Sequence, residues 1–335
     1  MRIAGVDTSR RVLVVAEIGN NHEGSLERAR EMIAAAARAG ADAVKFQVIT
    51  PERLVAPDQE QRLAQLRRFQ LSYDQFRDLA RTAAGLGLIF LATPFDLEAV
   101  RFLEPLVPAY KIASGDNDHL PLLEAVAATG KPILLSTGLS DLEGVVRAKD
   151  FIEGLWRRRA LGGELVLLHC VSAYPTPEGE ANLAAIRALA GLGCTVGYSD
   201  HTLGLEAAVL AVALGARVIE KHFTLDHRLS DFRDHRLAAD PEEMAELVRR
   251  IRQAEMLLGE GEKKVQPCEE ESRGAARRGL VAARDLPAGT VLAREHLDWL
   301  RPRRGLAPGG EHLVLGRRLR RALRRGQPIT PAEVD

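Results

Sequence analysis

The sequence has few cysteines, few aromatic residues and no net charge. Its three cysteines, Cys170, Cys194 and Cys268, are too few and too scattered for a disulfide framework or a cysteine-based zinc site. Basic and acidic residues both number 46, so no overall field attracts nucleic acid or an anionic membrane. No apolar run reaches the roughly 18 residues of a membrane span, and the opening MRIAGVDTSRR lacks the apolar region of a signal peptide. We therefore expect a cytoplasmic protein.

Short β-branched runs alternate with Ala- and Leu-rich segments of helical period over residues 1–258. Strands are expected at 12–19, 43–47, 88–95, 109–114, 132–137, 164–170, 194–200 and 216–223. Helices are expected between them, including a Ser25-capped helix over 25–40, an insertion plus a helix over roughly 58–86, and a closing helix over 241–259. Eight β/α units in about 250 residues predict an α/β fold, a (β/α)8 TIM barrel. A doubly wound sheet is the alternative, but no G-x-G-x-x-G follows the first strand.

Beyond the barrel the pattern changes twice. Residues 259–278 are charged and lack hydrophobic periodicity, which predicts a linker. Residues 279–335 combine short strands with Pro-Ala-Gly turns, which predicts a separate small domain whose core is marginal alone and docks on a barrel. This domain contains an arginine run, which comprises Arg317, Arg318, Arg320, Arg321, Arg324 and Arg325. The run is the one feature that favours nucleic-acid binding, but the preferred interpretation is the solvated face of a helix.

Polar side chains follow the carboxyl end of every expected barrel strand. Because these ends meet at one face of a barrel, we expect the side chains to line one active-site cavity. Two of them, His201 and His222, would suit a catalytic divalent metal with open coordination positions. The alternative for each is a capped structural histidine.

The remaining strand-end residues indicate an anion site. Lys45 and Lys111 offer charge, and three serines offer directed hydrogen bonds, so together they suit a ligand with both phosphate and carboxylate groups. The serines, which would otherwise cap helices, are Ser114, Ser136 and Ser199. Glu17 is the natural general base and Asp234 a second. With a carbonyl-polarising metal, this set predicts carbon–carbon bond formation between a phosphorylated enol and an aldehyde.

Several motifs resemble those of the sialic acid synthases, in the same order along the chain. They are AEIGNNHEGS (16–25), AVKFQ (43–47), ATPFD (92–96), YKIASGD (110–116), LSTG (135–138), LLHCVSAYPTP (167–177), GYSDHTLG (197–204) and EKHFTLD (220–226). The small domain resembles the antifreeze-like (SAF, β-clip) module of that family. The resemblance implies a transferase of the N-acetylneuraminate synthase type. Such an enzyme condenses phosphoenolpyruvate with N-acetylmannosamine or a related N-acyl amino sugar and releases phosphate by C–O cleavage, giving a nine-carbon 2-keto acid.

The resemblance also implies roles for single residues. His201 and His222 match the ligands of Mn2+, for which Mg2+ or Co2+ are alternatives. Matches to the phosphoenolpyruvate carboxylate site are Lys45, Thr93 and Lys111; matches to its phosphate contacts are Ser114, Ser136 and Ser199, with Ser172 where some members have asparagine. Matches around the amino sugar are Glu17 (also an acid/base candidate), Gln47, Asp116 and Tyr174. Arg301 matches an arginine that reaches the partner subunit's active site, which implies a homodimer with swapped SAF domains.

The chain departs from the family pattern mainly on the sugar side. The loop LSDFRDH (229–235) stands where the family usually has a sequence like PGPDH, so Asp234 and His235 are aligned with its last two residues. A small-domain aromatic residue is replaced near Ala275. The sequence does not identify the acceptor sugar. The candidates are N-acetylmannosamine, its 6-phosphate, and the diacetamido hexoses that lead to legionaminic or pseudaminic acid. A spore-coat polysaccharide synthase of the same family is a further alternative. A metal-dependent barrel aldolase or isomerase is less favoured, because it needs neither the serines nor Arg301. A non-enzymatic carbohydrate or nucleic-acid binder is the remaining alternative.

Overall fold

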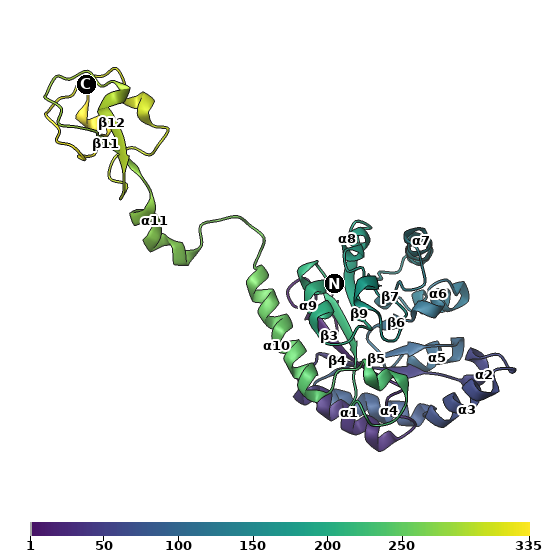
Figure 1. Ribbon diagram of the computed structural model, residues 1–335. Coiled ribbons are helices and arrows are strands. Elements are labelled where there is room, and N and C mark those ends of the chain that lie inside the picture. Colours follow the sequence, from purple (N-terminus) through teal and green to yellow (C-terminus); the bar gives the residue numbers. More distant parts are fainter. Residues whose placement is uncertain (1) are drawn as a thin grey trace. The chain divides into compact units, whose positions relative to one another are not determined.

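Eight parallel strands close into a barrel in the first part of the chain (Figure 1). The structure is a computed structural model that describes residues 2–335. Strand β10 pairs with β3 and closes the ring, so the expected TIM-type barrel is confirmed. The strands are β3 (Leu13–Gly19), β4 (Ala43–Val48), β5 (Ile89–Pro94), β6 (Tyr110–Ile112), β7 (Ile133–Ser136), β8 (Leu165–His169), β9 (Thr195–Asp200) and β10 (Val218–His222).

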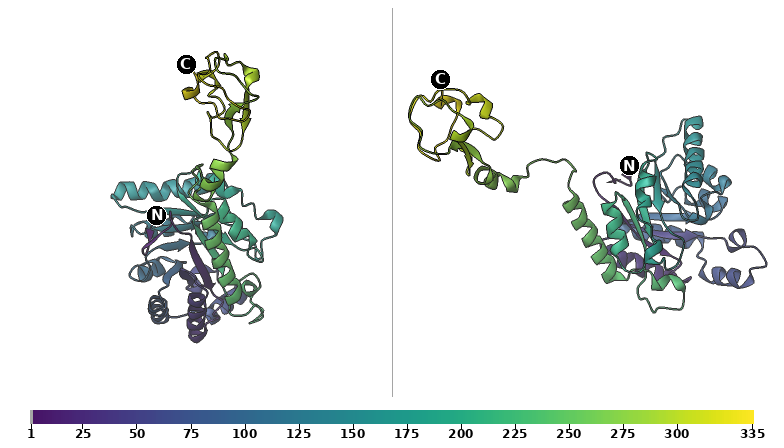
Figure 2. Two further views of the ribbon diagram at one scale, coloured as in Figure 1. Left: turned by 90° about the vertical axis from the view of Figure 1, so that its left-hand side faces the viewer. Right: turned by 45° about the horizontal axis from the view of Figure 1, so that its top comes forward.

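Helices cover the outside of the strands (Figure 2). Ser25 caps the first of them by accepting a hydrogen bond from the Arg28 amide, as expected from the sequence. The insertion after β4 folds into two short helices, and Ser72 then begins α4 with a capping box. The helices are α1 (Leu26–Arg38), α2 (Pro51–Leu54), α3 (Glu60–Phe69), α4 (Tyr73–Gly85), α5 (Leu97–Leu103), α6 (Leu120–Ala127), α7 (Leu142–Arg159), α8 (Ala185–Ala190), α9 (Glu206–Ala213) and α10 (Pro241–Leu258).

The interior of the barrel is apolar at the end where the strands begin. Side chains from the first halves of the strands form a buried cluster that includes Leu13, Leu91, Leu134 and Val218. A hairpin that the sequence did not predict, β1 (Arg2–Ile3) with β2 (Val6–Asp7), adds the fully buried Ile3 to this cluster. Because apolar side chains fill this end, polar groups can gather only at the other end of the barrel.

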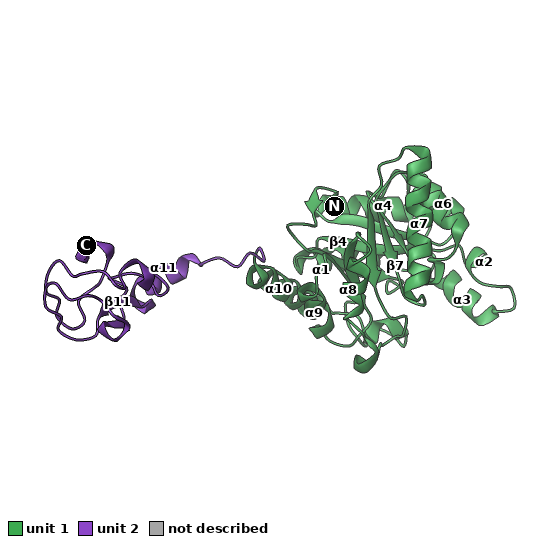
Figure 3. Ribbon diagram, turned by 90° about the horizontal axis from the view of Figure 1, so that it is seen from above, with its two compact units in different colours: residues 1–259 green, residues 260–335 purple. Residues whose placement is uncertain are grey.

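The chain divides into two compact units after Gly259 (Figure 3). In the second unit β11 (Gly279–Ala282) pairs antiparallel with β12 (Leu297–Leu300). The stretch expected to be a linker contains a short exposed helix, α11 (Glu270–Ala276). The second unit has its own apolar core, which includes Leu280, Leu286, Leu292, Val314, Leu319, Leu323, Ile329 and Val334.

The arginine run of the second unit is not helical, so the expected solvated helix face is wrong. Leu319 and Leu323 are buried, and a β-bridge joins Leu323 to Leu286. The run is therefore an irregular segment that two leucines anchor to the core while its arginines face solvent. In residues 2–335 we find no helix that is long and apolar enough to cross a membrane.

Candidate active site

A cavity of about 290 Å³ opens at the carboxyl ends of the barrel strands. Thirteen of the residues predicted for the site line it: Glu17, Lys45, Gln47, Thr93, Lys111, Ser114, Ser136, Ser172, Tyr174, Ser199, His201, His222 and Asp234. Asp116 does not line the cavity, and Arg301 belongs to the second unit. Other residues line it as well. Asn20 and Glu220 are polar strand-end residues that were expected at this face but given no individual role, and Arg62, Leu139, Phe232 and Arg233 were not expected there.

Four buried charges form the floor of the cavity. Lys45 Nζ lies 2.7 Å from Glu17 Oε2 and 3.8 Å from Glu220 Oε2. Lys111 Nζ lies 3.4 Å from Glu220 Oε1. All four residues are at most 4% exposed, so each charge depends on its partners instead of water. Glu220 was expected at this face but given no role from the sequence; its position two before His222 on one strand places both side chains on the same face.

Burial and ion pairing shift the pKa values of the carboxyl groups of Glu17 and Glu220 in opposite directions. Burial raises the pKa of Glu17 above its usual value, despite the nearby Lys45. Burial alone would also raise the pKa of Glu220, but Lys111 and Lys45 outweigh it and lower that pKa from 4.5 to about 2. Glu220 is therefore a fixed anion, while Glu17 is the carboxyl group able to exchange a proton.

Two amide side chains orient Glu17. Gln47 Nε2 donates a 2.9 Å hydrogen bond to Glu17 Oε1, and Asn20 Nδ2 donates one of 3.0 Å to Gln47 Oε1. Because the amides and the ammonium of Lys45 contact different oxygens, the carboxylate plane of Glu17 has little freedom to rotate.

Three serine hydroxyls converge beside this floor. Ser136 Oγ and Ser172 Oγ are buried, and neither finds a hydrogen-bond partner within residues 2–335. Ser114 Oγ accepts a 3.1 Å hydrogen bond from the Gly138 amide. A Cβ on Gly138 would lie only 2.5 Å from Ser172 Oγ and 2.7 Å from Ser114 Oγ, so glycine keeps this cradle open. Buried donors without partners are what an anion-binding cradle presents before its ligand arrives.

Ser199 behaves differently from the other serines that were predicted to bind an anion. Its hydroxyl donates a 2.8 Å hydrogen bond to Glu220 Oε1. In this arrangement Ser199 helps to hold Glu220 in place, and its predicted contact with a phosphate group stays a prediction.

The two histidines face each other across the cavity, with ring centroids 5.5 Å apart. His201 Nδ1 lies 2.8 Å from the carbonyl oxygen of Val171, which can only accept, so Nδ1 carries the proton and Nε2 offers a lone pair. His222 Nδ1 is buried, has no hydrogen-bond partner in the described chain, and lies 3.9 Å from Asp234 Oδ2. Burial lowers the pKa of His222 and brings that of His201 to about 4, so both rings are neutral at neutral pH. Two neutral imidazoles with free nitrogens fit a divalent transition-metal ion.

The mouth of the cavity is built by side chains from two loops and α3. Tyr174 packs against His201 with ring centroids 4.2 Å apart, and the guanidinium of Arg233 lies 4.7 Å above the Tyr174 ring. Arg233 Nε also donates a 3.2 Å hydrogen bond to Asp234 Oδ1. Arg62 reaches the same cavity from α3. The loop that departs from the family pattern therefore does form part of the wall.

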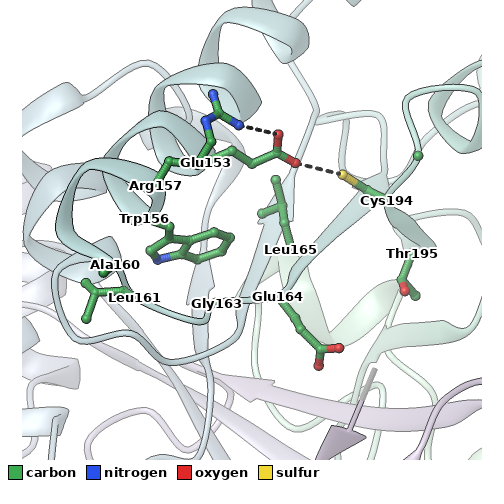
Figure 4. Close-up of a pocket in the computed structure, with 11 residues that line it drawn as sticks. Glu153, Trp156, Arg157, Ala160, Leu161, Gly163, Glu164, Leu165, Cys194 and Thr195 are labelled. Atoms are coloured by element: carbon green, nitrogen blue, oxygen red, sulfur yellow. Dashed lines mark hydrogen bonds and ion pairs between the residues drawn. The ribbon is translucent and has the colours of Figure 1, made fainter.

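A second pocket lies at the opposite end of β8 and β9, where those strands begin (Figure 4). Glu153 stands there between Arg157 and Cys194, at 3.7 Å and 3.9 Å respectively. The volume of this second pocket, about 470 Å³, exceeds that of the polar cavity, but the pocket lacks convergent hydroxyls and paired imidazoles. Chemistry, not size, identifies the candidate active site.

A barrel with paired lysines, an open hydroxyl cradle and two neutral histidines at the carboxyl ends of its strands is a (β/α)8 enzyme. The chain belongs to the NeuB family, whose model matches residues 32–263, and a SAF domain model matches residues 277–335. The resemblance to the sialic acid synthases and the SAF character of the small domain are thereby confirmed.

Similar proteins cover nearly the whole chain. The N,N'-diacetyllegionaminic acid synthase of Legionella pneumophila is 40% identical over 96% of this chain and 94% of its own length. An uncharacterized protein of Methanocaldococcus jannaschii is 42% identical over 92% of this chain and 90% of its own length. The crystal structure of N-acetylneuraminic acid (sialic acid) synthetase from Leptospira borgpetersenii is 35% identical, with a TM-score of 0.74 over 81% of this chain and 92% of that chain. The chain is thus a synthase of the family that includes sialic and legionaminic acid synthases.

Proposed function

We propose that this enzyme condenses phosphoenolpyruvate with an N-acyl amino sugar of the N-acetylmannosamine type, as an N-acetylneuraminate synthase does. The observation that carries the proposal is the single cavity in which two buried lysines, an open serine cradle and two neutral histidines converge. The product is a nine-carbon 2-keto acid. Phosphate is released by cleavage of the bond between C2 of phosphoenolpyruvate and the bridging phosphate oxygen.

Phosphoenolpyruvate fits the serine end of the cavity. The ammonium groups of Lys45 and Lys111 attract its carboxylate, with Thr93 beside Lys45 at 3.3 Å. The free hydroxyls of Ser136 and Ser172 donate to its phosphate oxygens, and Ser114 completes the cradle. Binding of the ligand would satisfy buried donors that have no partner otherwise.

His201 and His222 would hold a divalent ion, Mn2+ or in its place Mg2+ or Co2+. When bound, such an ion supplies a Lewis acid that polarises the carbonyl group of the acceptor. The neutral state of both imidazoles supports this role, because a protonated ring cannot ligate a metal.

The reaction we propose proceeds in two stages. The C2–C3 π electrons of phosphoenolpyruvate form the new bond to the aldehyde carbon of the open-chain sugar, and the aldehyde oxygen takes a proton from Glu17. Water adds at C2 and gives one proton back to Glu17. The new hydroxyl group then becomes the C2 carbonyl as the C–O bond to phosphate breaks, and its proton leaves with the phosphate. The raised pKa of Glu17, caused by its burial, supports this exchange because it makes the carboxyl group easier to protonate than an exposed one. Asp234, at the sugar side of the cavity, is a second acid/base candidate.

A diacetamido hexose that leads to legionaminic acid is the second candidate acceptor. The name of the Legionella relative, 40% identical over nearly the whole chain, favours it. The hexose that leads to pseudaminic acid, or the acceptor of a spore-coat polysaccharide synthase of this family, is a further candidate. The wall formed by Tyr174, Phe232 and Arg233 is where such acceptors would be distinguished.

The assembly we propose is a homodimer with exchanged SAF domains. Arg301 is exposed in the second unit and would extend its guanidinium toward the sugar bound in the partner subunit's barrel. Family membership supports this arrangement, which would add a cation to the sugar side of the cavity.

The test is phosphate release from phosphoenolpyruvate with Mn2+ and a panel of N-acyl amino sugars, with mass spectrometry of the product. We expect release with one acceptor and a product heavier by the pyruvyl unit. His222→Ala should abolish metal-dependent release and keep the fold, whereas the control His227→Ala, outside the cavity, should keep turnover. Release that needs no acceptor, or phosphoenolpyruvate that does not bind, would refute the proposal.

A further inference from the structure

Behind the two histidines, on the outer side of the barrel strands, lies a fully buried ion pair that the chemistry above does not use. Asp200 directly precedes His201, and Lys221 directly precedes His222. Side chains alternate along a strand, so these two charges point away from the cavity that the histidines line. Asp200 is 0% and Lys221 1% exposed, so the pair is among the most deeply buried charges of the chain.

The contacts of Lys221 clamp the chain on both sides of His201. In the parallel register Lys221 is paired with Asp200, and its Nζ donates a 2.9 Å hydrogen bond to Asp200 Oδ2. The same ammonium group donates a 2.6 Å hydrogen bond to the carbonyl oxygen of Thr202. One cation on the strand of His222 therefore holds the residues before and after His201.

Asp200 is held from its other side by three donors. The amide and the hydroxyl of Thr202 donate to Asp200 Oδ1 at 2.8 Å and 2.7 Å, and the Tyr198 hydroxyl donates at 3.2 Å. A buried charge with this many directed contacts has one geometry available to it, which makes the end of β9 and its following loop rigid.

The cavity side provides no comparable support for His222. His201 has a ring hydrogen bond to Val171, but His222 Nδ1 has none among the described residues. The place of the His222 imidazole therefore depends on where its backbone lies. The clamp by Lys221 adds side-chain contacts to the β9–β10 pairing that ties this backbone to the one carrying His201.

We infer that Lys221 and Asp200 are positioning residues that set the spacing of the two histidine ligands and so the affinity for the divalent ion. The inference rests on the proposed function, because that function assigns the metal to these histidines. Residues that orient metal ligands typically contribute a factor of 10 to 100 in metal affinity.

The test is the Kd of Mn2+ for the full-length protein, measured by calorimetry or by electron paramagnetic resonance of free Mn2+. The variant is Lys221→Met with Asp200→Asn. It removes both charges, keeps their volumes, and leaves an amide oxygen for the three donors, so no unpaired charge remains buried. We expect a melting temperature close to that of the wild type, a Kd raised about 10- to 100-fold, and recovery of kcat at saturating Mn2+.

The matched control is Arg252→Met with Asp42→Asn. This pair, 2.6 Å apart, joins α10 to the start of β4 at the opposite end of the barrel. It should leave the Mn2+ Kd unchanged.

An unchanged Kd in the Lys221/Asp200 variant, or an equal loss in the control, would overturn the inference. If that variant does not fold, Tyr198→Phe removes only the outermost hydrogen bond and should raise the Kd several-fold; no change would again overturn it. A wild type that binds no Mn2+ overturns the metal assignment and this inference together. A wild type that binds Mn2+ but releases no phosphate with any acceptor contradicts only the proposed reaction.

Discussion

Gly138→Ala should close the cradle that we assign to the phosphate group of phosphoenolpyruvate. The new methyl carbon would lie 2.5 Å from Ser172 Oγ, 2.7 Å from Ser114 Oγ and 2.9 Å from Cys170 Sγ. Gly138 has no positive φ, so alanine fits its backbone conformation and the effect comes from space alone. The two hydroxyls must move aside, away from the positions in which they would contact a phosphate group.

The magnitude follows from the hydrogen bonds that are lost. Each hydrogen bond to a charged group contributes about 1.5 to 3 kcal/mol, so displacing two serine hydroxyls costs about 3 to 6 kcal/mol of binding free energy. Because 1.4 kcal/mol is a factor of ten, the affinity for phosphoenolpyruvate should fall by about a hundredfold or more.

The assay is calorimetric titration of phosphoenolpyruvate, together with kcat/KM for phosphate release. The control is Gly162→Ala, where a Cβ meets no atom within 4 Å and the backbone conformation is also compatible with alanine. Wild-type affinity in Gly138→Ala would refute the location of the phosphate cradle. Equal losses in both variants would show that the effect is not local.

Three further predictions concern charge, packing and the second unit. Glu220→Gln should destabilise the protein by about 3 to 5 kcal/mol, because it leaves Lys111 buried without its anion. The pKa of Glu220 falls from 4.5 to about 2 on folding, so the stabilisation by this carboxylate is present above pH 4.5 and disappears toward pH 2. Urea titrations of wild type and variant should therefore give converging stabilities on acidification. Gly163→Ala should lower stability by at least about 1 to 3 kcal/mol, since its Cβ would lie 2.1 Å from the Trp156 ring, and an unchanged urea midpoint would contradict the close packing. Arg301→Ala should raise the KM of the sugar far more than that of phosphoenolpyruvate; proportional changes in steady-state kinetics would argue against a contact with the sugar.

Much of the barrel could be predicted because its local signals agree with one another. Alternating β-branched and Ala/Leu-rich runs correspond to the observed strands and helices, and Ser25 begins its helix as expected. The hairpin at residues 2–7 was missed, because two-residue strands carry no periodicity. The arginine run was expected on a solvated helix face and this was wrong, because bridges to other segments decide its conformation.

The candidate site was partly visible for a topological reason. In a parallel barrel all strands end at one face, so polar residues far apart in the chain could be expected in one cavity. Arg62 could not be found in this way, because it comes from an insertion that no strand end positions. Asp116 was expected at the sugar but lies outside the lining, in a 3-10 turn after β6.

By itself the sequence determined the order of the strands, the chemical types at their ends and the family to which the chain belongs. Only the tertiary structure decided which charges are partners: that Glu220 lies between Lys45 and Lys111, and that Ser199 supports Glu220. The reason is physical. The protonation state of a buried group is set by desolvation and by the few charges within several ångströms, and that neighbourhood exists only once strands distant in the chain have closed into the barrel.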